Sequence, residues 1–351
     1  MKKFAIAIVL SLLAVSCKEP VPDPVDPVVP ESSYELGADI SWVTEMETRG
    51  YNFYNDAGHI TECTNLMTEL GCTAIRLRVW VNPADGWNGR EDVYEKARRA
   101  RMLGLKVMID FHYSDWWADP GKQYMPEAWK KYSNDIDGMC DALAAHTRDV
   151  LQYLKDNGID VDWVQVGNEV DNGMLWDLGR IDRDHTAFTR LINAGYTAAK
   201  SVYPETRVIL HHANAYNLSD LTWFFDLVTE DKCNYDIIGL SLYPSYWDES
   251  QKAYPDWKPT TQMAVSNFKA LHDKYAKPVM LVEFGMPASE PDKAEAALQY
   301  IIDRTVGYDW FGGVFLWEPE SEHSRNGYDY GAFQDGRATS AMNPFKNFKK
   351  Q

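Results

Sequence analysis

The chain has 351 residues, of which 45% are hydrophobic and 25% charged, so composition excludes a disordered chain and favours a folded protein with a sizeable core. Its 35 basic and 52 acidic residues give a formal net charge of −17, which disfavours nucleic acid as a partner. Aromatic residues are abundant, with 13 Trp, 20 Tyr and 13 Phe. Trp at this level is typical of proteins that offer flat apolar platforms, and sugar rings stack on such platforms.

The first 33 residues predict export and a membrane anchor. Residues 1–16 carry Lys2 and Lys3 before an apolar run, which is typical of a signal peptide and too short for a stable transmembrane helix. Cys17 follows as in a bacterial lipobox, so we expect a lipid anchor on Cys17 and an outer-membrane or cell-surface lipoprotein. The alternative is a secreted or periplasmic protein. Residues 17–33, which include Cys17, are Pro-rich and predict an extended linker.

From residue 34 to residue 351, short apolar runs alternate with longer amphipathic stretches. Eight runs predict strands: residues 36–42, 74–80, 106–112, 163–167, 207–212, 237–242, 278–283 and 313–317. Helices are expected between them, for example at residues 93–103, 136–157, 185–202 (with Asp184 as N-cap), 260–275 and 292–306. This order predicts an α/β fold, a single (β/α)8 TIM barrel over residues 34–351. A doubly wound sheet is disfavoured because no Gly-x-Gly-x-x-Gly follows the first strand.

Alternation along the strands separates apolar faces from polar ones. In the second predicted strand Arg76 and Arg78 share one face, and Asp39, Asp110 and His112 lie on the polar faces of the strands before and after it. Because the apolar faces must meet the helices, we expect these polar groups to point into the barrel, near the carboxyl ends where barrel active sites lie. A layer of structural ion pairs that only closes the barrel is the alternative.

Two glutamates follow strands that lie opposite each other in such a barrel. Glu169 comes after the fourth strand, directly behind Asn168, and Glu283 ends the seventh. Carboxyl groups at these positions are expected roughly 5 Å apart, the separation of a retaining glycosidase. One would be the general acid/base and the other the ionised nucleophile.

The same residues carry a resemblance to a known family. An Asn-Glu pair after strand four with a Glu at the end of strand seven resembles the large clan of retaining (β/α)8 glycoside hydrolases. Within that clan the chain is similar to glycoside hydrolase family 53, the arabinogalactan endo-β-1,4-galactanases, at residues 37–41, 76–83, 110–123, 165–169 and 316–319. The resemblance implies that Glu169 is the acid/base and Glu283 the nucleophile, and that galactan and galacto-oligosaccharides are the partners.

Further residues are expected to support these two. Tyr243 is predicted to donate a hydrogen bond to Glu283, rather than only to pack in the core, and Trp317 to form the platform beneath the sugar at the cleavage site, rather than to plug the barrel. The residues after the third strand are expected to bind galactose hydroxyls or to orient Glu169. The complete predicted substrate-binding set is Asp39, Arg78, Asp110, His112, Tyr113, Asp115, Trp116, Asn168, Tyr243 and Trp317. One or two of Trp80, Trp87, Trp116, Trp117 and Trp247 are expected to form outer sugar subsites.

No cofactor and no metal are expected to be required. Some bacterial relatives carry calcium in a longer loop after the nucleophile strand, whereas the loop after Glu283 is short and has no Asp/Asn-rich run. A calcium site built from two loops is the alternative, with ligands from among Glu290, Asp292, Glu320, Glu322, Asn326 and Asp329. His211 and His212 are adjacent and face opposite ways, which argues against a site that uses both.

The cysteines and the remaining alternatives complete the sequence-based picture. Cys63, Cys72, Cys140 and Cys233 match no zinc spacing and are expected to be buried thiols rather than a disulfide. We expect a monomer.

The alternatives to a galactanase are a clan relative acting on mannan, xylan or glucan, a non-catalytic glycan-binding surface lipoprotein, and a metal-dependent barrel hydrolase. The presence of both glutamates argues against the binder, and eight scattered His without a His-x-His pair argue against the metal enzyme.

Overall fold

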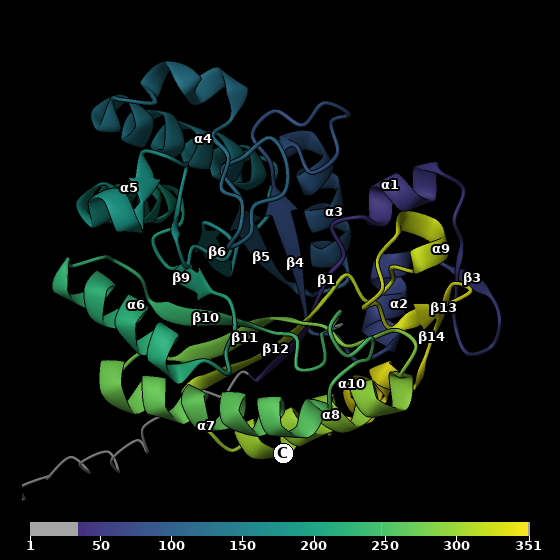
Figure 1. Cartoon of the computed structure of the whole chain (residues 1–351). Coiled ribbons are helices and arrows are strands. Elements are labelled where there is room, and N and C mark those ends of the chain that lie inside the picture. Colours follow the sequence, from purple (N-terminus) through teal and green to yellow (C-terminus); the bar gives the residue numbers. More distant parts are fainter. Residues whose placement is uncertain (1–33, 247, 350–351) are drawn as a thin grey trace, which may run out of the picture. The chain divides into compact units, whose positions relative to one another are not determined.

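The computed structural model describes residues 34–246 and 248–349, and its centre is a closed barrel of eight parallel strands. The predicted barrel is therefore confirmed, and its strand order is β1-β12-β11-β10-β9-β6-β5-β4 (Figure 1). The strands are β1 (Glu35–Asp39), β4 (Ala74–Val79), β5 (Lys106–Phe111), β6 (Trp163–Val166), β9 (Arg207–His212), β10 (Ile237–Leu242), β11 (Val279–Phe284) and β12 (Phe311–Trp317). Each coincides with one of the eight predicted strands to within a few residues.

Helices between the strands cover the outside of the barrel (Figure 1). The long ones are α3 (Arg90–Met102), α4 (Ile136–Asp156), α5 (Ile181–Val202), α6 (Leu218–Glu230), α7 (Trp257–Tyr275) and α8 (Pro291–Thr305). Within α5 the backbone of Asp184 is not helical, and its Oδ1 accepts hydrogen bonds from the amides of Thr186 and Ala187. Asp184 therefore caps the segment that follows it, as predicted. Helix α6 is the long helix that the sequence patterns did not single out.

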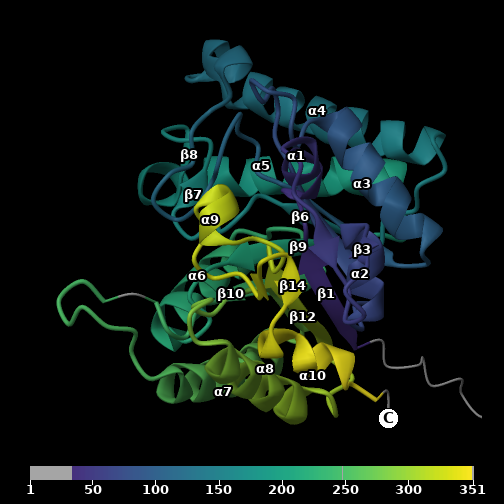
Figure 2. The ribbon, with the colours of Figure 1, turned by 90° about the vertical axis from the view of Figure 1, so that its right-hand side faces the viewer.

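Short elements complete the described chain. The helical ones are α1 (Val43–Thr48), α2 (Cys63–Glu69), α9 (His323–Asn326), α10 (Asn343–Lys346) and the 3-10 turns η1 (Glu127–Tyr132) and η2 (Ser340–Met342). A four-stranded sheet joins β2 (Phe53–Tyr54) and β3 (Ile60–Thr61) to β13 (Phe333–Gln334) and β14 (Arg337–Ala338), so the yellow C-terminal segments lie beside the purple N-terminal ones (Figure 2). Strands β7 (Gly173–Met174) and β8 (Gly179–Arg180) form a separate hairpin.

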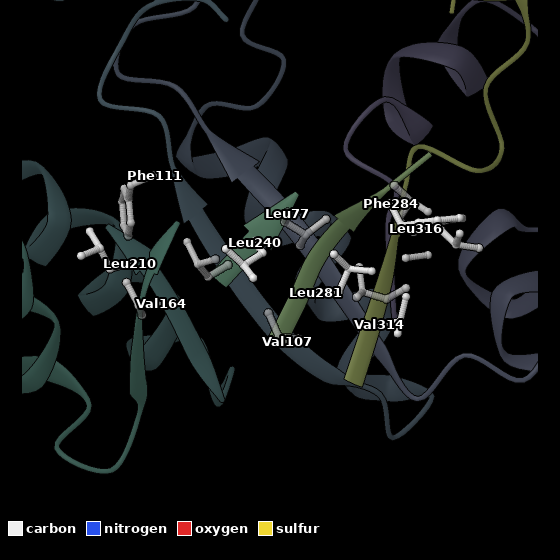
Figure 3. Close-up of a cluster of buried hydrophobic side chains, with 14 of the residues drawn as sticks. Leu77, Val107, Phe111, Val164, Leu210, Leu240, Leu281, Phe284, Val314 and Leu316 are labelled. Atoms are coloured by element: carbon white, nitrogen blue, oxygen red, sulfur yellow. The ribbon is translucent and has the colours of Figure 1, made fainter. Parts of the chain in front are cut away.

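The barrel strands bury both faces. Outward side chains such as Leu77, Val107 and Leu281 pack in one continuous core with the helices (Figure 3). Inward side chains near the amino ends of the strands, among them Met108 and Phe315, form a second, smaller cluster inside the barrel. Apolar residues thus fill the lower part of the barrel, and polar residues occupy the inward positions nearer the carboxyl ends, as the alternation predicts.

A bulge in β11 decides where Glu283 points. The pairing of β10 with β11 runs Leu240–Leu281 and then Ser241–Glu283, so Val282 is skipped. Strict alternation from the outward Leu281 would turn Glu283 outward as well. The extra residue reverses this, and Glu283 faces Arg76 inside the barrel at 3.4 Å.

Several expectations concern cysteines and the membrane. Cys63, Cys72, Cys140 and Cys233 are all free thiols, and the first two are buried. Among the residues that the structure describes, no helix combines the length and apolar character needed to cross a membrane. The predicted signal peptide, Cys17 and the Pro-rich linker lie outside the described residues, as does Trp247.

Candidate active site

A cavity of about 740 Å³ lies where the barrel strands end, and both predicted catalytic glutamates line it. Glu283 is the penultimate residue of β11, and Glu169 follows β6 after the turn at Gly167. The backbone of Glu169 has a φ of +45°, a left-handed conformation that is costly for a non-glycine residue and is found at functional sites. A carboxylate oxygen of Glu169 and one of Glu283 lie within 4.8 Å of each other.

The surroundings favour the ionised form of Glu283 more than that of Glu169. Burial raises the pKa of Glu283 to about 7, while Arg76 and the hydrogen bond from Tyr243 act to lower it. The Tyr243 hydroxyl donates to Glu283 Oε1 at 2.7 Å, so the predicted contact is present. The guanidinium of Arg76 lies 3.4 Å from the other oxygen of Glu283. A cation and a donor therefore stabilise negative charge on this carboxyl.

Among the described residues, no cation lies beside Glu169 in this way. Burial raises its pKa well above the ordinary value, and the carboxylates of Glu283 and Asp171 raise the pKa further. A hydrogen bond with the Ser241 side chain opposes the shift. Because the two carboxyls interact, they titrate as a pair that holds one proton over a range of pH, with the proton on Glu169.

Arg76 links two buried aspartates, Asp39 and Asp110, to Glu283. Its side chain is fully buried, with nitrogens 2.8 Å from Asp39 Oδ2 and 2.9 Å from Asp110 Oδ2. It also donates to Asn168 Oδ1 at 2.9 Å. Two buried carboxylates thus satisfy the charge of Arg76 and fix its orientation. The predicted structural ion pairs do exist, and they also support the active site.

A chain of hydrogen bonds between inward-facing strand residues reaches Glu169. His211 Nδ1 accepts from the amide of Glu169 at 3.3 Å and from Gln165 Nε2 at 2.9 Å, so its proton lies on Nε2, which contacts Ser241 Oγ at 2.7 Å. Burial, together with the nearby Arg76, lowers the pKa of His211 and keeps it neutral. Gln165, His211 and Ser241 were missing from the predicted site, although inward alternation marks all three positions.

The segment after β5 holds the Asn168–Glu169 turn. Gln123 Nε2 donates to the backbone carbonyls of Asn168 and Glu169, at 2.8 and 3.2 Å. Asn168 Nδ2 in turn donates to the carbonyl of Ala118 at 2.8 Å. His112 accepts the amide of Ala118 on Nδ1, at 3.2 Å, and its Nε2 lies 3.1 Å from Asp110. This explains why so long a motif accompanies the Asn-Glu pair: it fixes the backbone that carries Glu169.

Comparisons with known proteins agree with this geometry. Residues 35–310 match the family model of glycosyl hydrolase family 53. The chain belongs to this family. It is 32% identical to a probable arabinogalactan endo-β-1,4-galactanase A of Aspergillus fumigatus (74% of this chain, 72% of that one) and 34% identical to an uncharacterized protein of Niallia circulans (76% and 71%). A solved fungal β-1,4-galactanase superposes with a TM-score of 0.80 and 28% identity, over 90% of this chain and 99% of that one.

The structure separates the predicted substrate-binding residues into two groups. His112, Asn168, Tyr243 and Trp317 line the cavity of this family 53 protein, and Trp116 lines a neighbouring one. The other five, Asp39, Arg78, Asp110, Tyr113 and Asp115, do not line either cavity.

In the structure these five residues contact other groups of the protein, so their predicted contact with substrate stays a prediction. Asp39 and Asp110 are buried against Arg76. Arg78 is buried beneath Trp117, 4.2 Å from the ring centre, and pairs with Glu318. Tyr113 lies on the outward face with Phe111, on whose ring it stacks, and its hydroxyl lies 2.8 Å from that of Thr147.

Asp115 stabilises loops. Its two carboxylate oxygens accept the backbone amides of Asn82 at 2.9 Å and Glu127 at 2.8 Å. Both oxygens are therefore engaged with the protein itself, outside the cavity.

Aromatic rings form one wall of the cavity. Trp317, at the end of β12, lies edge-on to Trp42, Trp117 and Tyr328, with ring centres 5.5, 5.7 and 4.6 Å apart. A second cavity of about 250 Å³ begins at Trp42 and Trp117 and continues along Trp80, Trp87 and Trp116. A continuous aromatic surface thus leads away from the two glutamates.

Four of the six residues named for a two-loop calcium site contact other groups of the protein. Glu322 accepts the amides of Asp335 and Gly336 and pairs with Arg325, and Asp329 pairs with His323. On the other loop Glu290 pairs with Lys293, and Asp292 accepts from Ser340. Within the described part of the chain, no metal-sized cluster of three carboxylates or histidines includes any of these residues. These four carboxylates are therefore held by other partners, and the expectation that no metal is required stays a prediction.

Proposed function

We propose that this family 53 protein is a retaining endo-β-1,4-galactanase in which Glu283 is the nucleophile and Glu169 the general acid/base. The separation of the two carboxylates carries the proposal. Oxygens within 4.8 Å of each other suit direct attack on the sugar, whereas an inverting enzyme needs roughly 6.5–9.5 Å to admit a water molecule. The unequal surroundings of the two groups support this assignment of their roles.

The reaction then proceeds in two displacements. The ionised Glu283 attacks the anomeric carbon from below while Glu169 gives its proton to the departing glycosidic oxygen. The products of this step are a glycosyl ester on Glu283 and a shortened chain. Glu169, now ionised, takes a proton from a water molecule that displaces Glu283, which restores both carboxyls. The chemistry is complete with two carboxyls and water, so no cofactor enters it.

The polysaccharide is inferred from the family and the aromatic wall. Relatives are named as galactanases, and the adjoining cavities lined by Trp42, Trp117 and Trp317 provide room for several sugar units of a long chain. We therefore expect cleavage within β-1,4-galactan, the backbone of type I arabinogalactan, with release of galacto-oligosaccharides.

A substrate panel tests the specificity. The purified protein is incubated with linear β-1,4-galactan, mannan, xylan and glucan, and the products are separated by chain length. We expect a ladder of short oligosaccharides early in the digest of galactan alone. Preferential cleavage of another backbone would place the specificity elsewhere in the clan, and binding without cleavage would favour the non-catalytic alternative.

We further propose that the protein is a lipoprotein exported to the outer membrane or cell surface, on the basis of the sequence around Cys17. Expression in a bacterial host with labelled fatty acid tests this. We expect label in the wild-type protein and none in Cys17→Ala, which should be released from the membrane fraction. An unlabelled wild-type protein would favour ordinary secretion.

A further inference from the structure

His212 is the one histidine of the adjacent pair that the reaction does not use. It ends β9 with its side chain outside the barrel, fully buried beside Phe224 of α6 at a ring distance of 4.8 Å. Two carboxylates flank it: Asp171, in the loop after β6, and Asp220, in the first turn of α6. One ligand atom of each of these three residues lies within 4.8 Å of the others.

The contacts of His212 determine where its proton lies. Nδ1 is 2.6 Å from the carbonyl oxygen of Ala213 and 3.3 Å from Asp171 Oδ1, and since both oxygens accept, Nδ1 carries the hydrogen. Nε2 then offers a lone pair, and it is buried with no hydrogen-bond partner among the described residues. The atom that faces it is Asp220 Oδ2, at 3.8 Å. Two acceptors facing each other across this gap repel unless a cation lies between them.

The spacing fits a metal ion. With bonds of about 2.0–2.2 Å to nitrogen and oxygen, two ligands of one ion lie between roughly 3.4 Å (tetrahedral) and 4.3 Å (opposite) apart. The 3.8 Å between Nε2 and Asp220 falls in this interval. Metal-binding histidines also donate their other N–H to a carbonyl or carboxylate, which is what Nδ1 does with Ala213.

We propose that Asp171, His212 and Asp220 bind a divalent transition-metal ion such as Zn²⁺ or Mn²⁺, with water completing its coordination. An imidazole nitrogen with two carboxylates favours these ions over Ca²⁺, which takes oxygen ligands. The Asp220 side chain is 41% exposed, so an ion can enter from solvent.

The position of the site suggests that the ion braces the cavity wall. Asp171 lies two residues beyond Glu169, and its Oδ2 accepts the amide of Ala213 at 3.0 Å. Ala213 and Asn214 both line the catalytic cavity. An ion at this site would join the segments after β6 and β9 to α6, so its effect would be on the stability of this wall and not on the bond-breaking steps.

Metal titration tests the proposal. Full-length protein is treated with a chelator, dialysed and titrated with Zn²⁺ and with Co²⁺, by calorimetry and visible absorption. We expect one equivalent to bind, with Co²⁺ bands of a nitrogen/oxygen site and a rise in melting temperature that depends on metal concentration. Asp220→Ala should weaken binding at least 10-fold.

Two further variants make the result specific. Asp231→Ala removes the carboxylate of the surface pair His185–Asp231 and should leave binding unchanged. Glu283→Gln should also leave it unchanged, which distinguishes this site from the cluster of Glu169, His211 and Glu283. No uptake by the wild-type protein, or equal uptake by Asp220→Ala, would overturn the proposal. A preference for Ca²⁺ would also overturn it.

Discussion

At the scale of single residues, the proposed mechanism depends on the different environments of two glutamates. Glu283 has a cation and a hydroxyl donor beside it, and Glu169 has mainly carboxylates and a neutral His211. The proton that the pair retains therefore belongs on Glu169, which is the state that the first displacement requires.

Glu283→Ala should lower kcat on galactan by at least about 10⁴-fold, because the attacking carboxylate is lost, while galacto-oligosaccharide binding changes little. Azide should restore turnover and give the α-galactosyl azide, since the small anion enters the space left by the side chain. Calorimetry with oligosaccharide and an azide titration measure both effects. The exposed Glu205→Ala serves as control, and a Glu283→Ala protein that retains most of its activity would refute the assignment.

Glu169→Ala should affect substrates according to their leaving group. An aryl β-galactoside with an acidic phenol needs no protonation, so its first step should be nearly unchanged and the glycosyl-enzyme should accumulate. Cleavage of galactan should be lost. A stopped-flow burst of phenol followed by a slow steady state is the expected signal. Equal losses on both substrates would rule out the acid/base role.

At the scale of elements, the segment after β5 acts as a support for the turn after β6. Gln123→Ala would remove the donor to the carbonyls of Asn168 and Glu169. We expect kcat on galactan to fall by roughly 100-fold, because small displacements of a catalytic group are costly. The exposed Gln152→Ala is the matched control. Steady-state kinetics separate the two outcomes, and an unchanged kcat in Gln123→Ala would show that the turn is held by other contacts.

Sequence patterns predicted the barrel strands because each is a short apolar run with a polar inward face. They could not predict the β11 bulge, which depends on how Leu240 and Ser241 pair with a strand distant in sequence. Proximity in sequence misled the prediction for Tyr113. Alternation places Tyr113 on the outward face with Phe111, opposite to His112, so its side chain lies away from the cavity. The sheet of β2, β3, β13 and β14 was missed because two-residue strands have no periodicity.

For the whole molecule, the buried carboxyls make stability depend on pH. Burial raises the pKa of Glu169, Glu283, Glu318 and Glu320, so the folded chain keeps protons that the unfolded chain has released above its ordinary pKa of about 4.5. The free energy of unfolding that these groups contribute is therefore highest below that pH and falls as pH rises through 7.

Glu169→Gln should remove one such group. Relative to the wild type, its melting temperature should rise by roughly 2–4 °C more at pH 8 than at pH 5, because the cost of ionising Glu169 has gone. Scanning calorimetry at both pH values measures the change, with Glu205→Gln as the exposed control. A difference that is the same at both pH values would show that Glu169 has no raised pKa in the folded protein.

The most direct test of the central claim is the configuration of the first product. Proton NMR, recorded within the first turnovers on β-1,4-galactan, distinguishes the two anomers before they interconvert. Two carboxylates whose oxygens lie within 4.8 Å predict a double displacement, so the β-anomer should appear first and the α-anomer only later by mutarotation. Initial release of the α-anomer would contradict the account, because it would require a water molecule between the two glutamates.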